Sequence, residues 1–140
     1  MKQKVLSLFL ALSMTFILAG TTFAATPRWD NTDRVSPTLT FSGSTATCEV
    51  TIIGKSGTSR IVATVELQIQ NSNGSYTRSA SWSTRTVYDE VFTFSEKAYN
   101  RPAGNYRLIV NATVYNSSGV GENIYAEAYR TYNGSTGTTG

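Results

Sequence analysis

The sequence lacks histidine altogether, and it contains a single cysteine, Cys48, among its 140 residues. Without histidine the chain lacks the usual general base near neutral pH, the Ser-His-Asp and Cys-His arrangements, and the commonest ligand of zinc and copper. With one cysteine it cannot form an intramolecular disulfide. These absences argue against nucleophilic catalysis and against a transition-metal site, and we expect neither a metal nor a cofactor.

Carboxylates are the remaining candidates for catalysis. Asp89 with Glu90, or Glu122 with Glu127, could supply an acid and a base as in glycoside hydrolases. Adjacent residues on a strand point to opposite faces, however, so Asp89 and Glu90 do not readily flank one bond. We interpret these acids as solvated charges and expect no catalytic residue. The oxygen-rich segment 30–33 lacks the later Gly and Glu of a helix-loop-helix calcium site, which favours an Asx turn before the first strand.

Long apolar runs are confined to the N-terminus. Lys2 and Lys4 precede a mainly apolar segment at 5–18, and Thr22-Phe23-Ala24 fits the small-x-small cleavage rule of a secretory signal peptide. The apolar segment is shorter than the roughly 20 residues needed to span a bilayer. We therefore expect a signal peptide at residues 1–24, cleaved after Ala24, and a secreted, extracellular mature chain without an integral membrane anchor.

The mature chain has little net charge. Without residues 1–24 it keeps ten basic and nine acidic residues, a net charge of +1. Its basic residues are scattered among the acids, whereas phosphate binding needs a clustered basic surface, so we expect no nucleic-acid partner. The length suits one domain. We expect an N-terminal segment at 25–33, a single domain at 34–133 and a flexible Gly/Ser/Thr tail at 134–140.

Apolar and polar residues alternate in short segments separated by Gly, Ser and Asn. The cleanest alternation runs from Ile61 to Ile69, and Asn73-Gly74 after it is a strong hairpin signal. The pattern predicts strands near 35–41, 46–52, 61–69, 75–86, 92–94, 106–114 and 122–132, although it does not decide the buried side of the last one. The fold class predicted is all-β, an immunoglobulin-like antiparallel β-sandwich of about seven strands, with a small barrel as the alternative.

Three residues are predicted to be structural. Cys48 alternates with apolar neighbours, so we expect a buried, unmodified thiol. The segment around Tyr106 looks like the tyrosine corner of immunoglobulin-like sandwiches, with the ring buried and the hydroxyl bonded to backbone in the preceding loop. Leu108 would then take the place of the second core cysteine of such domains and contact Cys48 across the core.

Several short motifs occur in a fixed order along the mature chain. They are Arg28-Trp29, the segment from Ser42 to Cys48, Leu67-Gln68 followed by Asn73 to Tyr76, Trp82, and Gly104 to Arg107. In order and spacing these residues resemble a group of uncharacterised short secreted proteins of Gram-positive, clostridia-like bacteria. The resemblance implies secretion and an immunoglobulin-like fold, and it supplies no activity. Where such proteins often carry Trp, this chain has Tyr76.

Aromatic residues give the stronger indication of function. Exposed rings on a sheet can stack on sugars or anchor a protein partner. The candidate ligand-contact residues are Tyr76, Trp82, Tyr125, Tyr129 and Tyr132. The alternative is that each ring caps the sandwich or pairs across strands. Asn-x-Ser/Thr sequences at Asn73, Asn111, Asn116 and Asn133 are interpreted as polar turns or strand ends.

These features together favour a secreted, non-catalytic module that binds an unidentified protein or glycan of the cell envelope or its surroundings. One alternative is a carbohydrate-binding module that uses exposed aromatic residues, and another is a structural cell-surface subunit that assembles through open strand edges. A glycan site should present two or three coplanar exposed rings, whereas a protein site should present a mixed apolar patch.

Overall fold

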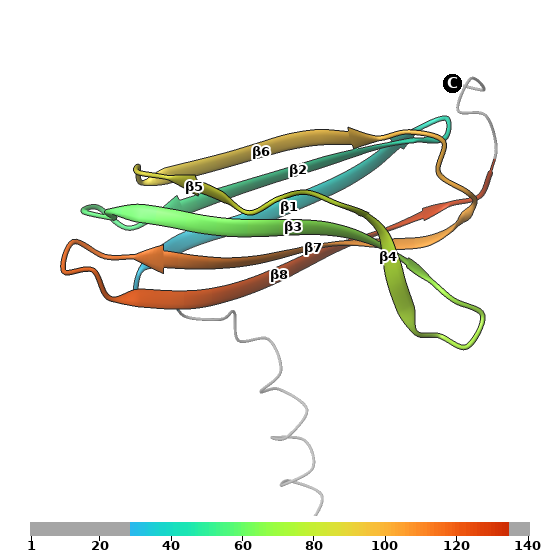
Figure 1. Ribbon diagram of the computed structural model, residues 1–140. Coiled ribbons are helices and arrows are strands. Elements are labelled where there is room, and N and C mark those ends of the chain that lie inside the picture. The colour runs from blue at the N-terminus through green and yellow to red at the C-terminus, as the bar shows by residue number, and fades with distance from the viewer. Residues whose placement is uncertain (1–28, 135–140) are drawn as a thin grey trace, which may run out of the picture.

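The computed structural model describes residues 29–134 as two antiparallel β-sheets packed face to face (Figure 1). The all-β prediction is confirmed, and the two separate sheets make the fold a β-sandwich rather than a small barrel. Residues 29–134 form no helix, so none there has the length and apolarity to cross a membrane. The predicted signal peptide at 1–24 and nearly all of the predicted tail lie outside the described residues.

The smaller sheet has three strands in the order β1-β2-β6, and the larger has the order β4-β3-β7-β8, with β5 also paired to β3. The first sheet consists of β1 (Thr32–Ser42), β2 (Thr45–Gly54) and β6 (Val91–Ala98). The second consists of β3 (Arg60–Gln70), β4 (Tyr76–Ser81), β5 (Arg85–Val87), β7 (Gly104–Tyr115) and β8 (Gly121–Tyr132). All pairings are antiparallel.

The core lies between the two sheets and follows the alternation seen in the sequence. Alternate residues of β2, β3, β6 and β7 are buried, among them Ile52, Leu67, Phe92 and Val110. On β8 the buried side is that of Ile124, so the neighbouring odd-numbered residues face outward. The inward positions after Ile124 are alanines, which are only partly buried.

The segment predicted as one strand at 75–86 is divided in two. The register of β3 with β4 shifts between Leu67 and Gln68, and β4 ends at Ser81. Trp82 then packs against the core before β5 resumes pairing with β3 at Arg85. Residues 29–134 therefore form eight strands instead of about seven, because the Trp82 ring packs at the sandwich edge and interrupts the ladder.

The sandwich begins earlier than predicted. β1 starts at Thr32, inside the predicted N-terminal segment, and Trp29 packs against the core. Glu122 of β8 fixes the start of β1, since its carboxylate accepts hydrogen bonds from the Asn31 N–H at 3.0 Å and from the Thr32 hydroxyl at 3.1 Å. Asn31 donates through Nδ2 to the carbonyls of Val114 and Val120, both at 2.9 Å, in place of the predicted Asx turn.

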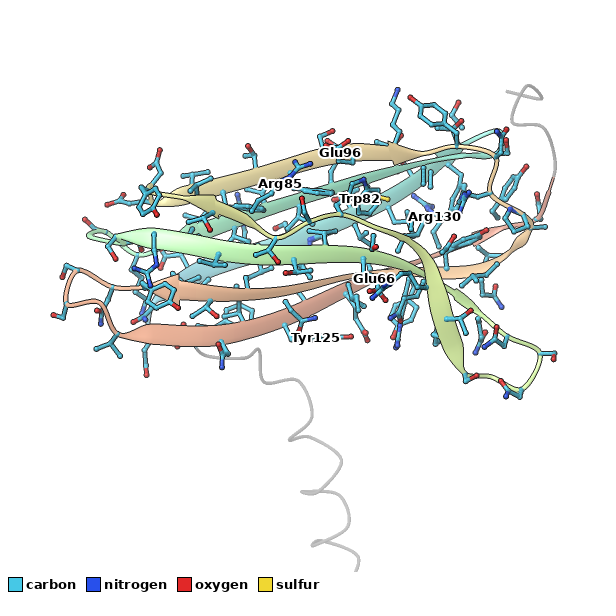
Figure 2. The ribbon with its side chains drawn as sticks, in the orientation of Figure 1. Glu66, Trp82, Arg85, Glu96, Tyr125 and Arg130 are labelled. Carbon is cyan, nitrogen blue, oxygen red and sulfur yellow. The ribbon has the colours of Figure 1, made fainter. Side chains whose placement is uncertain are left out.

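Two arginines, both labelled in Figure 2, bridge the sheets at different pairs of strands. Arg85 of β5 pairs with Glu96 of β6, with 2.5 Å between Nη2 and Oε2. Arg130 of β8 donates through Nε to the Leu39 carbonyl of β1 at 3.1 Å. The two sheets are thus joined by polar side chains, and the outer face of the larger sheet remains uncovered by any other described strand.

Candidate functional site

The outer face of the β4-β3-β7-β8 sheet carries a connected set of polar and aromatic side chains. Strand register aligns the outward residues of β3, β7 and β8 into rows that run across the sheet. We name each row by its β7 residue: the Arg107 row (Gln68, Arg107, Tyr129), the Ile109 row (Glu66, Ile109, Glu127), the Asn111 row (Thr64, Asn111, Tyr125) and the Thr113 row (Val62, Thr113, Asn123). Figure 2 shows Glu66 and Tyr125 along this sheet, away from the strands of the smaller sheet.

Two exposed tyrosines on β8 share one carboxylate. The Tyr125 hydroxyl donates to Glu127 Oε2 at 2.8 Å, and the Tyr129 hydroxyl donates to Oε1 at 2.5 Å. Residues two apart on a strand lie on the same face, which allows both contacts. The hydrogen bonds from Tyr129 and then Tyr125 lower the pKa of Glu127, because they stabilise its ionised form. The rings are 48% and 57% exposed, yet each is fixed at its hydroxyl.

Arg107 connects a third ring to this pair. Its Cζ lies 4.0 Å from the centroid of the Tyr76 ring, a cation–π contact, while its Nε donates to Gln68 Oε1 at 2.7 Å. Tyr76 in turn meets the edge of Tyr129, with 6.5 Å between ring centroids. Tyr76, Tyr125 and Tyr129 therefore form one continuous surface, which we call the tyrosine patch.

Charges on this face are matched in pairs. Arg78 Nε lies 3.0 Å from Glu66 Oε1, and Arg107 Nη1 lies 3.8 Å from Glu127 Oε2. Gln68 also donates to Glu66, with 2.6 Å between Nε2 and Oε2. Because each of these charges has an opposite neighbour, the face carries no concentrated charge of one sign.

A depression of about 380 Å³ lies next to the tyrosine patch. Its lining residues are Val62, Thr64, Asn111, Ala112, Thr113, Asn123 and Ile124. Asn111 contributes to it from the middle of β7, so the interpretation of that residue as a turn or strand end is wrong. The alternation of β7 could have indicated the outward position of Asn111, since its neighbours Val110 and Ala112 are both buried.

Two of the predicted contact residues lie elsewhere. Trp82 is half-buried, with its ring centroid 5.2 Å from that of Phe94 in an edge contact. Tyr132 stacks on Phe41, with centroids 5.0 Å apart and ring planes at 7°. Both rings pack against the core at the borders of the sandwich, so the structure brings only Tyr76, Tyr125 and Tyr129 together.

The residues predicted to be structural lie in the core. Cys48 is a free, buried thiol, and desolvation by burial raises its pKa to about 12. Tyr106 is 1% exposed, donates its hydroxyl to the Pro102 carbonyl, and meets Phe41 with 5.0 Å between ring centroids. Leu108 is fully buried in the same core cluster as Cys48.

The carboxylates considered for catalysis have structural partners. Glu122 faces the inner side of β8 and holds the start of β1, whereas Glu127 faces the opposite side. Glu90 accepts a hydrogen bond from the Gly57 N–H at 2.7 Å, and Asp89 accepts one from the Glu90 N–H at 2.6 Å. Within residues 29–134 there is no group of three or more Cys, Asp or Glu residues able to hold a metal ion.

Comparison with known proteins gives no family. No protein-family model matches the chain, and no curated protein matches it. Among solved structures, the chain is similar to a Bordetella pertussis protein assigned as ApaA, with 12% identity, a TM-score of 0.48, and coverage of 74% of this chain and 97% of that one. It is also similar to the sporulation control protein Spo0M of Bacillus subtilis, with 13% identity, a TM-score of 0.38, and coverage of 72% and 49%.

Proposed function

We propose that this protein is a secreted, non-catalytic binding module that contacts its ligand with the outer face of the β4-β3-β7-β8 sheet. One observation carries the proposal. Tyr125 and Tyr129 are each about half exposed, and both hydroxyls are held by the same carboxylate of Glu127. Tyrosine is among the residues that contribute most to binding energy at interfaces.

The fixed rings reduce the cost of binding. Immobilising a flexible surface side chain on association costs about 0.5 to 1.5 kcal/mol. Tyr125 and Tyr129 are already held by hydrogen bonds to Glu127, and Tyr76 is held between Arg107 and Tyr129. Much of this ordering is therefore present before a ligand arrives, which supports a role for the patch in recognition.

A non-catalytic role is supported by the positions of the acids. Glu122 and Glu127 lie on opposite faces of β8, so they do not flank a common substrate. Glu127 is ionised, surrounded by hydrogen-bond donors and near Arg107, an arrangement that disfavours proton donation near neutral pH. We infer that these carboxylates organise the fold and the patch.

We also propose that the sandwich is of immunoglobulin-like type. The order β1-β2-β6 against β4-β3-β7-β8 corresponds to strands A-B-E facing C′-C-F-G. The Tyr106 hydroxyl bond to Pro102, at the start of the strand in the F position, is the contact of a tyrosine corner. The resemblance to secreted proteins of Gram-positive bacteria supports an extracellular setting for the module.

Retention on purified Gram-positive cell walls tests the function, with the mature chain and three variants. Tyr125→Ala and Tyr129→Ala should each weaken retention by about tenfold, because each removes a preorganised ring, equivalent to about 1.4 kcal/mol of binding energy. Tyr88→Ala is the matched control, since Tyr88 is 81% exposed in the turn between β5 and β6. Equal retention of all three variants and the parent would contradict the proposed surface.

A further inference from the structure

We infer that the depression beside Tyr125 binds a segment of a neutral polysaccharide, with the Tyr125 ring stacked on one sugar unit. This inference rests on the proposed function and names the ligand class of the same face. Three properties of the site support it: its shape, its hydrogen-bonding groups and its lack of charge.

The shape follows from the sizes of the side chains in successive rows. The Asn111 and Thr113 rows contribute mainly small side chains on β3 and β7, namely Thr64, Val62, Asn111 and Thr113. On one side stands the taller Ile109 row, and on the other Arg60 covers the Tyr115 ring, with Cζ 3.8 Å from its centroid. Short side chains on β3 and β7 between these taller groups account for the depression. A volume of about 380 Å³ lies in the range of small-ligand sites.

The hydrogen-bonding groups suit a ligand rich in hydroxyls. Among residues 29–134, the Asn111 side-chain amide has no hydrogen-bond partner, so it can both donate and accept. Asn123 accepts from the Thr113 hydroxyl at 2.8 Å through Oδ1, which orients its amide and leaves the NH₂ group to donate. Val62 adds an apolar surface beside these groups. A sugar presents the same combination of hydroxyls and apolar C–H surface.

The position of Tyr125 supplies the stacking surface. Tyr125 is paired directly with Asn111 in the β7–β8 register, so it lies next to a lining residue of the depression, although it is not itself one of the lining residues. Its hydroxyl is bonded to Glu127, and this bond points the hydroxyl toward the Ile109 row and limits rotation of the ring. A sugar that hydrogen-bonds to Asn111 would therefore find an exposed and oriented aromatic face next to it.

The absence of charge selects a neutral ligand. No lining residue is charged, and the nearby arginines Arg78 and Arg107 already have carboxylate partners. Arg60, at the side of the depression, lies over the Tyr115 ring instead. An anionic ligand would need free basic groups at this position. A protein partner would favour an apolar patch. The exposed large hydrophobic residues of this face are Tyr125 and Tyr129, whose hydroxyls are bonded to Glu127, whereas Val91 and Val120 lie outside its outward rows. The neutral glycan is the occupant that these groups fit.

The test uses an array of neutral and acidic glycans, followed by titration calorimetry with the best-binding neutral hexasaccharide. Asn111→Ala should weaken its affinity by at least about tenfold, as should Tyr125→Ala. Asn105→Ala is the matched control, because Asn105 lies on the same strand and face but outside the depression, bonded to Gln70 and Thr131. It should leave the affinity within about twofold. Unfolding midpoints of all variants show whether each remains folded.

A spectroscopic measurement makes the assignment direct. In the isotope-labelled mature chain, the hexasaccharide should shift the side-chain amide resonances of Asn111 and Asn123 and leave that of Asn105 in place. Binding to no neutral glycan, or binding that Asn111→Ala leaves unchanged, would overturn the inference. If Tyr129→Ala weakens retention of the protein on cell walls but only acidic glycans or proteins bind, the inference fails and the proposed function stands. If neither Tyr125 nor Tyr129 affects retention, both fail.

Discussion

The hydroxyl of Tyr106 gives the sharpest test of how the sandwich is stabilised. Its ring is 1% exposed in the core and its hydroxyl donates to the Pro102 carbonyl at the start of the turn before β7. Tyr106→Phe removes this hydrogen bond and keeps the ring. Pro102 is exposed, so water can satisfy its carbonyl once the hydroxyl is gone. The expected loss is therefore the net value of one hydrogen bond, about 0.5 to 1.5 kcal/mol, without a penalty for a buried, unsatisfied acceptor.

Tyr106→Ala should cost several times more. It removes the ring from contact with Phe41 and leaves a cavity between the sheets. Large-to-small changes at buried aromatic positions cost about 3 to 5 kcal/mol. The free energy of unfolding of small domains is about 5 to 15 kcal/mol. Tyr106→Ala should therefore be only marginally stable, whereas Tyr106→Phe should fold normally.

Urea denaturation measures both effects. With a dependence on urea of about 1 to 3 kcal/mol per molar, a loss of 1 kcal/mol lowers the midpoint by roughly 0.3 to 1 M. Tyr88→Phe is the control, because the hydroxyl of Tyr88 lies on an 81% exposed residue and should leave the midpoint unchanged. An unchanged midpoint for Tyr106→Phe, or an equal shift for Tyr88→Phe, would refute the assignment of a stabilising hydrogen bond to this hydroxyl.

Two further predictions concern pH. The Cys48 thiol has an ordinary pKa of 9.0 in the unfolded chain and about 12 in the folded protein, so the stability that comes from this difference is present below pH 9 and is lost as the pH rises toward 12. Cys48→Ala should remove this pH dependence of the unfolding free energy. Rapid thiol labelling of the native protein at neutral pH would contradict a buried thiol. The pKa of Glu127 lies below its ordinary value of 4.5, so the stability that the ionised carboxylate contributes is lost as the pH falls below 4.5. Glu127→Gln should abolish this loss and lower the raised pKa of Tyr129, as followed by ultraviolet absorbance titration; an unchanged tyrosine titration would show that the shared carboxylate does not hold the rings.

Most of the strands could be predicted because alternation is a local property of the sequence. The run from Ile61 to Ile69 needs no knowledge of its partners to indicate a strand with one buried face. The division of the fourth strand could not be predicted in this way. It depends on Trp82 meeting Phe94 of β6, a contact between segments that the sequence pattern does not relate to each other.

The buried side of β8 shows the same limit. Ile124 and the two alanines after it carry less apolar volume than the tyrosines on the opposite side, so the pattern alone is ambiguous. Pairing with β7 resolves it, because Ala112, which is buried, lies opposite Ile124. The register of a strand is set by its neighbours as well as by its own residues.

The types of residue in the candidate site could be predicted from the sequence, but which residues come together there could not. Exposed tyrosines could be proposed from the sequence, but the residues that organise them could not. Glu127 was considered as a catalytic acid and interpreted as a solvated charge, and Asn111 was interpreted as a polar turn or strand end. Their roles depend on which strands are adjacent: Asn111 meets Tyr125 through the β7–β8 pairing, and Arg107 reaches Tyr76 across β3.

The same alternation that builds the core also separates binding from stability on this face. Asn111 stands between Val110 and Ala112, both buried, so replacing its outward amide leaves the inward neighbours in place. Substitutions at surface positions away from such buried contacts usually change stability by no more than about 0.5 kcal/mol. A tenfold loss of affinity corresponds to about 1.4 kcal/mol, well above that limit. Loss of glycan binding with an unchanged unfolding midpoint in Asn111→Ala would therefore be assigned to the surface itself and not to a weakened fold.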